Sequence, residues 1–171
     1  MVAMNPTALV VAGQLQAMGS AGTPYDRAMT MKAQGLFQKA LFRGKLGSIK
    51  GKLTGRAAYL SGLATDTAGK TTVIDHHEMG QAVPMERVRG SESRSRDFDR
   101  DFNPLQTHTR QRWINVAKAR LSDVPLPSVE LIRLGDDYYV RDGHHRISVA
   151  KALGQIYIDA EVTVLKVVPA N

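Results

Sequence analysis

The stretch YYVRDGHHRISVAKALG spans residues 138–154 and decides the fold. Its aromatic and β-branched beginning is typical of a strand, and the Asp-Gly pair at 142–143 ends that strand. The residues that follow predict a helix with Gly154 as its C-terminal cap. Strand, turn and helix therefore meet at the His-His-Arg cluster of residues 144–146, which packing alone does not require.

The segment after this helix has the clearest strand pattern in the chain. Residues 156–165, IYIDAEVTVL, alternate between apolar and polar side chains. One face of the predicted strand then carries all of its apolar positions: Ile156, Ile158, Ala160, Val162 and Val164.

Similar patterns extend upstream. Val129–Leu134 predicts a strand that pairs with Tyr138–Arg141 as a hairpin. Residues 106–121 predict an amphipathic helix, and Val83–Val88 predicts a short strand that a charged loop follows. The order β, loop, α, β, β, α, β over residues 81–171 predicts a compact α+β domain with a small mixed sheet.

The N-terminal part is helical in spacing but rich in glycine. Residues 24–61 contain five glycines after Thr30, and each costs a helix interior about 1 kcal/mol relative to alanine. We therefore expect one or two short helices and a loosely structured segment at 43–56, within a helical arm over residues 1–61. Residues 62–80 are expected to be a linker.

His76, His77 and Glu78 lie in that expected linker. Neighbouring side chains diverge on a helix or a strand, and no fourth ligand follows at a familiar spacing. No metal site is predicted.

The composition indicates a globular chain. Of the 171 residues 43% are hydrophobic, which is enough to form a core, and none is cysteine, so disulfides, thiolate metal sites and thiol nucleophiles are excluded. No apolar run approaches the roughly 20 residues that a membrane-spanning helix needs. No basic residue precedes Arg27, so the start lacks the pattern of a secretory signal, and we expect a cytoplasmic protein.

The net charge of +7 is concentrated in the arm. Residues 1–60 hold eight Lys and Arg against one acid, whereas residues 81–171 hold 14 basic and 12 acidic residues. Such a basic arm predicts a polyanionic partner, first of all a nucleic acid and less favourably an anionic membrane surface. A solvated helix packed on the body explains the arm equally well. The candidate nucleic-acid contacts are Arg43, Lys45, Lys50, Lys52 and Arg56.

The cluster at residues 142–146 has the chemistry of an anion site. Gly143 tolerates a positive φ, and the first turn of the following helix presents free N–H groups backed by the helix dipole. Arg146 adds a planar fork that suits phosphate oxygens, His144 and His145 add donors, and Asp142 is placed to hold one of these groups or a ligand. The competing explanation is that Asp142 caps the helix and the histidines face solvent.

Residues 126–162, from LPSVELIRLGDDYYVRDGHHRISVAKALG to IYIDAEV, resemble the ParB/sulfiredoxin-like superfamily, and VPMERVRGSESRSRDFD resembles its first strand and arginine-bearing loop. The whole pattern is similar to bacterial ParB-like proteins. Sulfiredoxins need a cysteine before the His-Arg pair, which this chain lacks. Partition proteins bind CTP here and carry a helical DNA-reading domain after it, for which we expect no counterpart in this sequence.

The DGHHR box is most similar to free serine kinases of this fold, which hold nucleotide phosphates with it. This resemblance implies a nucleotide ligand (ATP, ADP or CTP, with Mg²⁺) at residues 142–146, with phosphotransferase or nucleotide hydrolase activity. The implied catalytic base is Glu92, with Glu86 as the second candidate, and His145 and Arg146 stabilise the transferred phosphoryl group. Arg94 and Arg96 are further phosphate contacts.

Two other functions stay open. One is a non-enzymatic nucleic-acid-binding protein that uses the basic arm on DNA or RNA. The other is a ParB-type nuclease in which His145 acts as the base, although no metal-binding acid cluster supports it.

Overall fold

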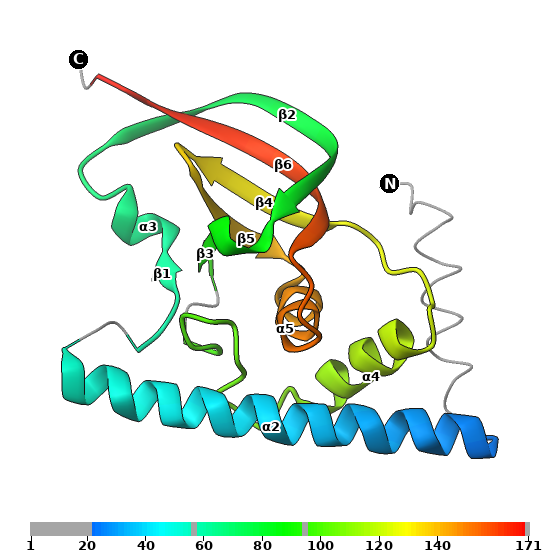
Figure 1. The fold of residues 1–171 in the computed structure, drawn as a ribbon. Coiled ribbons are helices and arrows are strands. Elements are labelled where there is room, and N and C mark those ends of the chain that lie inside the picture. The colour runs from blue at the N-terminus through cyan, green and yellow to red at the C-terminus, as the bar shows by residue number, and fades with distance from the viewer. Residues whose placement is uncertain (1–21, 56–57, 94–95, 170–171) are drawn as a thin grey trace.

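The computed structural model of the chain describes residues 22–55, 58–93 and 96–169. Its centre is a six-stranded mixed sheet in the order β1-β3-β5-β4-β6-β2 (Figure 1). The strands are β1 (Ser61–Gly62), β2 (Thr71–Pro84), β3 (Val88–Ser91), β4 (Val129–Leu134), β5 (Asp137–Asp142) and β6 (Tyr157–Val168). The helices are α2 (Pro24–Thr54), α3 (Leu63–Asp66), α4 (Arg110–Leu121) and α5 (His144–Ala152), with a 3-10 turn, η1 (Met85–Arg87). The predicted α+β class with a mixed sheet is confirmed.

The C-terminal half follows the sequence patterns closely. β4 and β5 form the predicted antiparallel hairpin, and β6 pairs with β4 in parallel after the α5 crossover. Ala160, Val162 and Val164 of β6 are buried on the face that α5 covers. Ile156 is the exception, because it precedes the strand and is 73% exposed.

Residues 62–80 are not the irregular linker that the sequence led us to expect. They hold the end of β1, all of α3 and the first part of β2, and β2 pairs antiparallel with β6 from Thr71 to Pro84. β2 lies at the sheet edge with most of its side chains exposed, so it shows no alternation of buried and exposed positions. A strand without a buried face leaves no periodic signal in the sequence.

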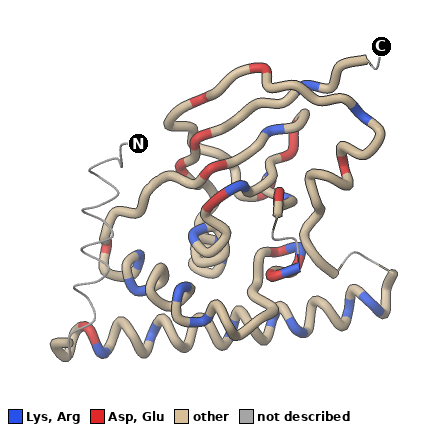
Figure 2. Tube along the Cα trace, turned by 180° about the vertical axis from the view of Figure 1, so that it is seen from behind, with Lys and Arg blue, Asp and Glu red and all other residues tan. Residues whose placement is uncertain are grey.

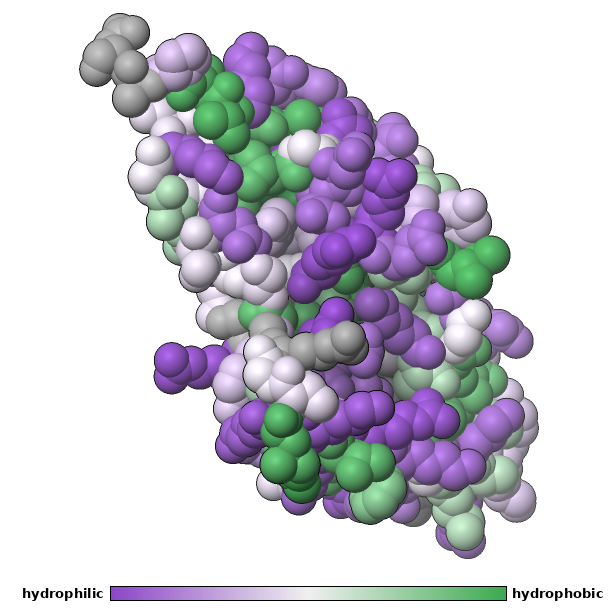
Figure 3. Space-filling view, turned by 60° about the vertical axis from the view of Figure 1, so that its left-hand side comes forward, coloured by the Kyte–Doolittle hydropathy of each residue, from purple (hydrophilic) through white to green (hydrophobic). Residues whose placement is uncertain are grey.

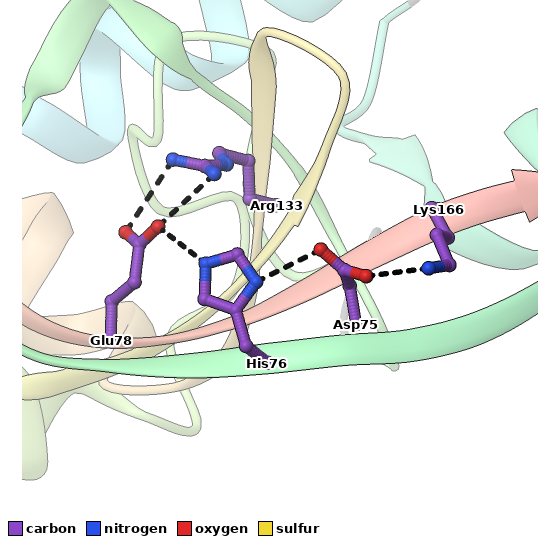
Figure 4. Close-up of polar contacts among 5 residues, drawn as sticks. All are labelled: Asp75, His76, Glu78, Arg133 and Lys166. Atoms are coloured by element: carbon purple, nitrogen blue, oxygen red, sulfur yellow. Dashed lines mark hydrogen bonds and ion pairs between the residues drawn. The ribbon is translucent and has the colours of Figure 1, made fainter.

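A series of ion pairs links side chains of β2 to side chains of β4 and β6 (Figure 4). The carboxylate of Glu78 bridges Arg133 of β4 and His76 Nε2, at 3.1 and 3.0 Å. The carboxylate of Asp75 bridges His76 Nδ1 and Lys166 of β6, at 3.0 and 2.7 Å. Hydrogen bonds to Asp75 and then to Glu78 raise the pKa of His76. Across the described residues no group of three or more His, Cys, Asp and Glu is arranged to hold a metal ion.

The predicted strand Val83–Val88 covers a corner instead. β2 ends at Pro84, η1 follows, and β3 begins only at Val88. Val83, Met85 and Val88 are all buried, so the apolar positions were recognised but their backbone geometry was wrong.

Within the described part of the arm, Pro24–Thr54 forms one continuous helix, α2, rather than one or two short ones, so residues 43–54 are helical and not loosely structured. Its glycines allow close packing. A Cβ at Gly44 would lie 2.7 Å from the carbonyl oxygen of Pro104, and one at Gly47 would lie 3.1 Å from Asp99 Oδ2. The helix therefore accepts the propensity cost of glycine where its backbone touches the loop over residues 99–104.

Two hydrophobic clusters join the layers. The larger one lies between the sheet and α5, with Leu131, Val140 and Ile147 at its centre. The second lies between α2, α4 and α5, where the rings of Phe37 and Trp113 meet edge to face at 5.5 Å. Trp113 Nε1 donates to Ser148 Oγ at 2.8 Å, so α4 is also hydrogen-bonded to α5. The arm helix thus shares a buried core with the rest of the molecule.

Candidate functional site

The junction between β5 and α5 has the backbone geometry that the sequence predicts. Gly143 has φ +98°, and a Cβ there would lie 2.5 Å from Val129 Cγ1. Only glycine fits such a position. The first residues of α5 follow directly, and no side chain caps the helix, so the explanation of Asp142 as a cap is wrong. The helix begins with its dipole directed at the space in front of Gly143.

Both histidines are buried, so they do not simply face solvent. His144 and His145 are 5% and 6% exposed. His144 Nε2 lies 2.7 Å from Ser91 Oγ at the end of β3. The ring of Phe98 stacks on His144 at 6.0 Å and meets His145 edge to face at 5.6 Å. Both rings are thereby held in fixed orientations.

The loop that carries Phe98 is held by Asp99. The Asp99 carboxylate accepts hydrogen bonds from the backbone N–H groups of Asp101 and Asn103 and from the Asn103 side chain. Burial raises the pKa of Asp99, and the hydrogen bonds from Asn103 oppose this shift. Phe102, next in the same loop, packs under Lys151 of α5, and burial lowers the pKa of that lysine. The charged segment that the sequence predicts to be a loop therefore positions Phe98, whose ring contacts both histidines.

The guanidinium group of Arg146 is already bound by protein acceptors and is not free to bind a phosphate in this arrangement. One of its terminal nitrogens donates to the carbonyl oxygens of Pro127 and Ser128, at 2.7 Å each, and the other pairs with the Asp142 carboxylate. Its side chain is 15% exposed. In this arrangement Arg146 ties the first turn of α5 to the chain before β4 and fixes Asp142.

An open cleft of about 560 Å³ lies in front of this junction. Residues 142–146 form one wall, α4 contributes Arg112 and Val116, and β5 contributes Arg141. Arg112 is exposed and forms no ion pair with any residue that the structure describes. The described lining therefore contains three arginines against one acid, Asp142.

Glu92 lies beside the cleft but does not line it. Its two carboxylate oxygens accept hydrogen bonds from the Arg141 guanidinium at 3.2 and 3.4 Å. A third nitrogen of Arg141 donates to Thr163 Oγ1 at 3.4 Å. The side chain of Glu92 is 40% exposed, and its backbone N–H extends the β3–β5 ladder by donating to Val140. To act as a base, Glu92 has to leave this ion pair.

The other predicted residues divide between the surface and the undescribed part of the chain. Arg96 is exposed and does not line the cleft, and Arg94 lies outside the described residues. Glu86, the second candidate base, lies in η1, away from the cleft lining. Of the five arm residues, Arg56 also lies outside the description, and the other four are exposed on α2: Arg43, Lys45, Lys50 and Lys52.

Sequence reasoning missed Arg112 and Arg141. Arg112 lies in RQRW on the first turn of α4, and nothing local relates that turn to residues 142–146. Arg141 is one residue before the DGHHR box, and its position near the end of the strand that leads into the candidate site could have identified it.

Comparisons with known proteins give one structural likeness. The chain is similar to the crystal structure of sulfiredoxin from Arabidopsis thaliana, with 21% sequence identity over 50% of this chain and 84% of that chain, and a TM-score of 0.35. No protein-family model and no curated protein matches the chain. A TM-score this low says nothing about activity.

Proposed function

We propose that the cleft in front of α5 binds the phosphate groups of a nucleotide. The observation that carries this proposal is the convergence of Arg112, Arg141 and the α5 N-terminus on one cleft in which Asp142 is the single described acid. Positively charged side chains and free backbone N–H groups favour an anion there. The rings of His144 and His145 line the same cleft, and their contacts with Phe98 hold them in fixed orientations.

The size of the cleft favours a nucleotide over inorganic phosphate. Its volume of about 560 Å³ falls within the roughly 300–1,000 Å³ of typical small-molecule sites. Mg²⁺ would be held mainly by the phosphates of ATP, ADP or CTP, because one carboxylate is a poor cage for that ion. Phosphotransfer or nucleotide hydrolysis follows from this proposal if Glu92 releases Arg141 and acts as base, with His145 facing the transferred group.

Calorimetric titration tests the proposal. The full chain is titrated with ATP, ADP, CTP and GTP, with and without Mg²⁺, beside the variant Arg112→Ala. Arg110→Ala is the matched control, because Arg110 is also exposed on the first turn of α4 but does not line the cleft. We expect micromolar binding that Arg112→Ala weakens about tenfold, as the loss of one charge-assisted contact predicts.

The result that contradicts the proposal is equally clear. No heat with any nucleotide, or equal affinity in Arg110→Ala and Arg112→Ala, would remove the cleft as a phosphate site. If the chain binds a nucleotide but neither hydrolyses it nor transfers its phosphate to any added acceptor, the proposal of nucleotide binding stands and the proposal of phosphotransferase or hydrolase activity is excluded.

A further inference from the structure

The outward face of α2 carries large apolar side chains that belong to none of the hydrophobic clusters of the described residues. Five large side chains along the helix are more than half exposed, with exposed fractions of 72, 68, 56, 58 and 82% for Met31, Phe42, Leu46, Ile49 and Leu53. At about 100° per residue they fall within one narrow stripe. The buried side chains Ala33, Phe37, Ala40, Leu41 and Gly44 lie on the opposite side.

The apolar character of the inner face of α2 follows from its packing within the fold. The inner face packs on Trp113, Ile114 and Ala117 of α4 and forms the second hydrophobic cluster. The outer stripe contributes nothing to that core. Contiguous apolar residues at spacings of four, three and four from Phe42 to Leu53 form an exposed patch of the kind that marks an interaction surface.

Basic side chains run along both edges of the stripe. Lys32, Lys39, Arg43 and Lys50 project on one side, and Arg27, Lys45 and Lys52 on the other, by the same helical angles. All seven are exposed, and none forms an ion pair with a described residue. Asp26, the single acid of α2, pairs with Lys118 on the inner side. Figure 2 shows these Lys and Arg positions spread along the whole helix.

The helix lies where a flat surface can reach it. α2 runs along one edge of the molecule, and the sheet and the other described helices are all on its inner side (Figure 1). Figure 3 looks toward the C-terminal end of α2 and shows hydrophobic side chains at that edge, bordered by hydrophilic ones. From Met31 to Leu53 the stripe is about 33 Å long.

We propose that α2 docks the protein on an anionic lipid surface. The helix lies in the plane of the membrane, its apolar stripe enters the boundary between headgroups and acyl chains, and its lysines and arginines contact lipid phosphates. This mode does not need a spanning segment, and no described helix is long and apolar enough to cross a bilayer.

Charge complementarity selects this occupant over two others. A nucleic acid would match the basic edges but would leave the central apolar stripe against a polar backbone. A second copy of the chain would cover the stripe but bring two sets of unpaired basic residues together. Anionic lipid satisfies both features at once.

Vesicle flotation with the full chain tests the proposal. Phosphatidylcholine vesicles are compared with vesicles of phosphatidylcholine and phosphatidylglycerol. Phe42→Gln, Ile49→Gln and Leu53→Gln each remove one apolar side chain and keep the charge, and glutamine favours a helix about as well as leucine and better than phenylalanine or isoleucine. We expect binding only to the anionic vesicles, with a loss of about tenfold or more for each substitution.

Two controls separate insertion from adsorption. Ile156→Gln and Met79→Gln remove equally exposed apolar side chains elsewhere, and they should bind like the parent chain. In Phe42→Trp the new indole should shift its emission to the blue on anionic vesicles, while fully buried Trp113 stays constant.

Several outcomes would overturn the proposal. They are failure of the parent chain to float with anionic vesicles, unchanged binding in all three glutamine variants, or no shift in Phe42→Trp. Two positive results would identify another occupant: a concentration-dependent dimer that Leu53→Gln dissociates, without lipid binding, or duplex DNA binding in a chain that ignores lipid.

Discussion

At Gly143 the backbone and the packing both require glycine. Gly143→Ala should lower the free energy of unfolding by roughly 2–4 kcal/mol, because alanine would adopt φ +98° and contact Val129. Gly135→Ala is the control, since Gly135 also has a positive φ (+62°) but open space around its Cβ position. It should cost about 1–2 kcal/mol. Urea denaturation measures both, and equal losses would show that Val129 gives way without cost.

The residues of the candidate site could be predicted only in part from the sequence. The DGHHR box could be recognised as a candidate site because glycine, histidine and arginine are unusual together at the end of a strand. In the structure these residues line one cleft. The residues that surround this box in the structure could not be predicted from the sequence. Ser91, Phe98 and Arg112 are brought to it by tertiary packing, and Arg146 is occupied by carbonyl oxygens of residues 127–128 that no local pattern marks.

At the scale of elements, the glycines of α2 should respond in opposite directions. Gly35 has open space around its Cβ position, so Gly35→Ala should stabilise the protein by about 1 kcal/mol through helix propensity. Gly44→Ala should destabilise it, because the new methyl group would lie 2.7 Å from the Pro104 carbonyl. Thermal melts of the two variants beside the parent chain measure the difference, and stabilisation by both would contradict the close contact.

The charged contacts of β2 predict a dependence on pH. Asp75 and Glu78 raise the pKa of His76 in the folded chain above the ordinary 6.5. A raised pKa means that this contribution to stability is complete below pH 6.5 and is lost as the pH rises through the folded value. The stability of the parent chain should therefore decline over that interval, measured as the urea midpoint at a series of pH values.

Two substitutions identify His76 as the origin of that decline. His76→Gln should remove it, and Asp75→Asn should shrink it, because Asp75 is the largest cause of the shift. A parent-like decline in His76→Gln would assign the effect to another group.

Element prediction succeeded where one face of an element is buried. β6 alternates because α5 covers one side of it, and α4 is amphipathic because it packs on α2 and α5. β2 and α2 were misjudged for physical reasons. β2 is exposed on both faces, and α2 has apolar side chains on two opposite faces and glycines at a packing contact.

For the whole molecule, the shared core predicts that the arm helix is needed for stability. Phe37 is fully buried against Trp113, so Phe37→Ala should lower the free energy of unfolding by about 3–5 kcal/mol. Far-UV circular dichroism during urea denaturation measures the loss. Phe42→Ala, on the exposed outer face, should change it by less than about 0.5 kcal/mol. A small effect of Phe37→Ala would mean that the arm unfolds separately.

The pairing of β2 with β6 also sets the order of events during folding. Thr71 pairs with Val168 and Pro84 with Tyr157, so the ladder closes over 97 (168 − 71) to 73 (157 − 84) residues. Such long-range pairing is expected to slow folding to about milliseconds or more, because the chain entropy is lost before the contacts form. During synthesis on the ribosome, β2 cannot pair with β6 until β6 has been synthesised. We expect the histidines and acids of β2 to keep the unpaired strand from associating with other nascent chains in that interval.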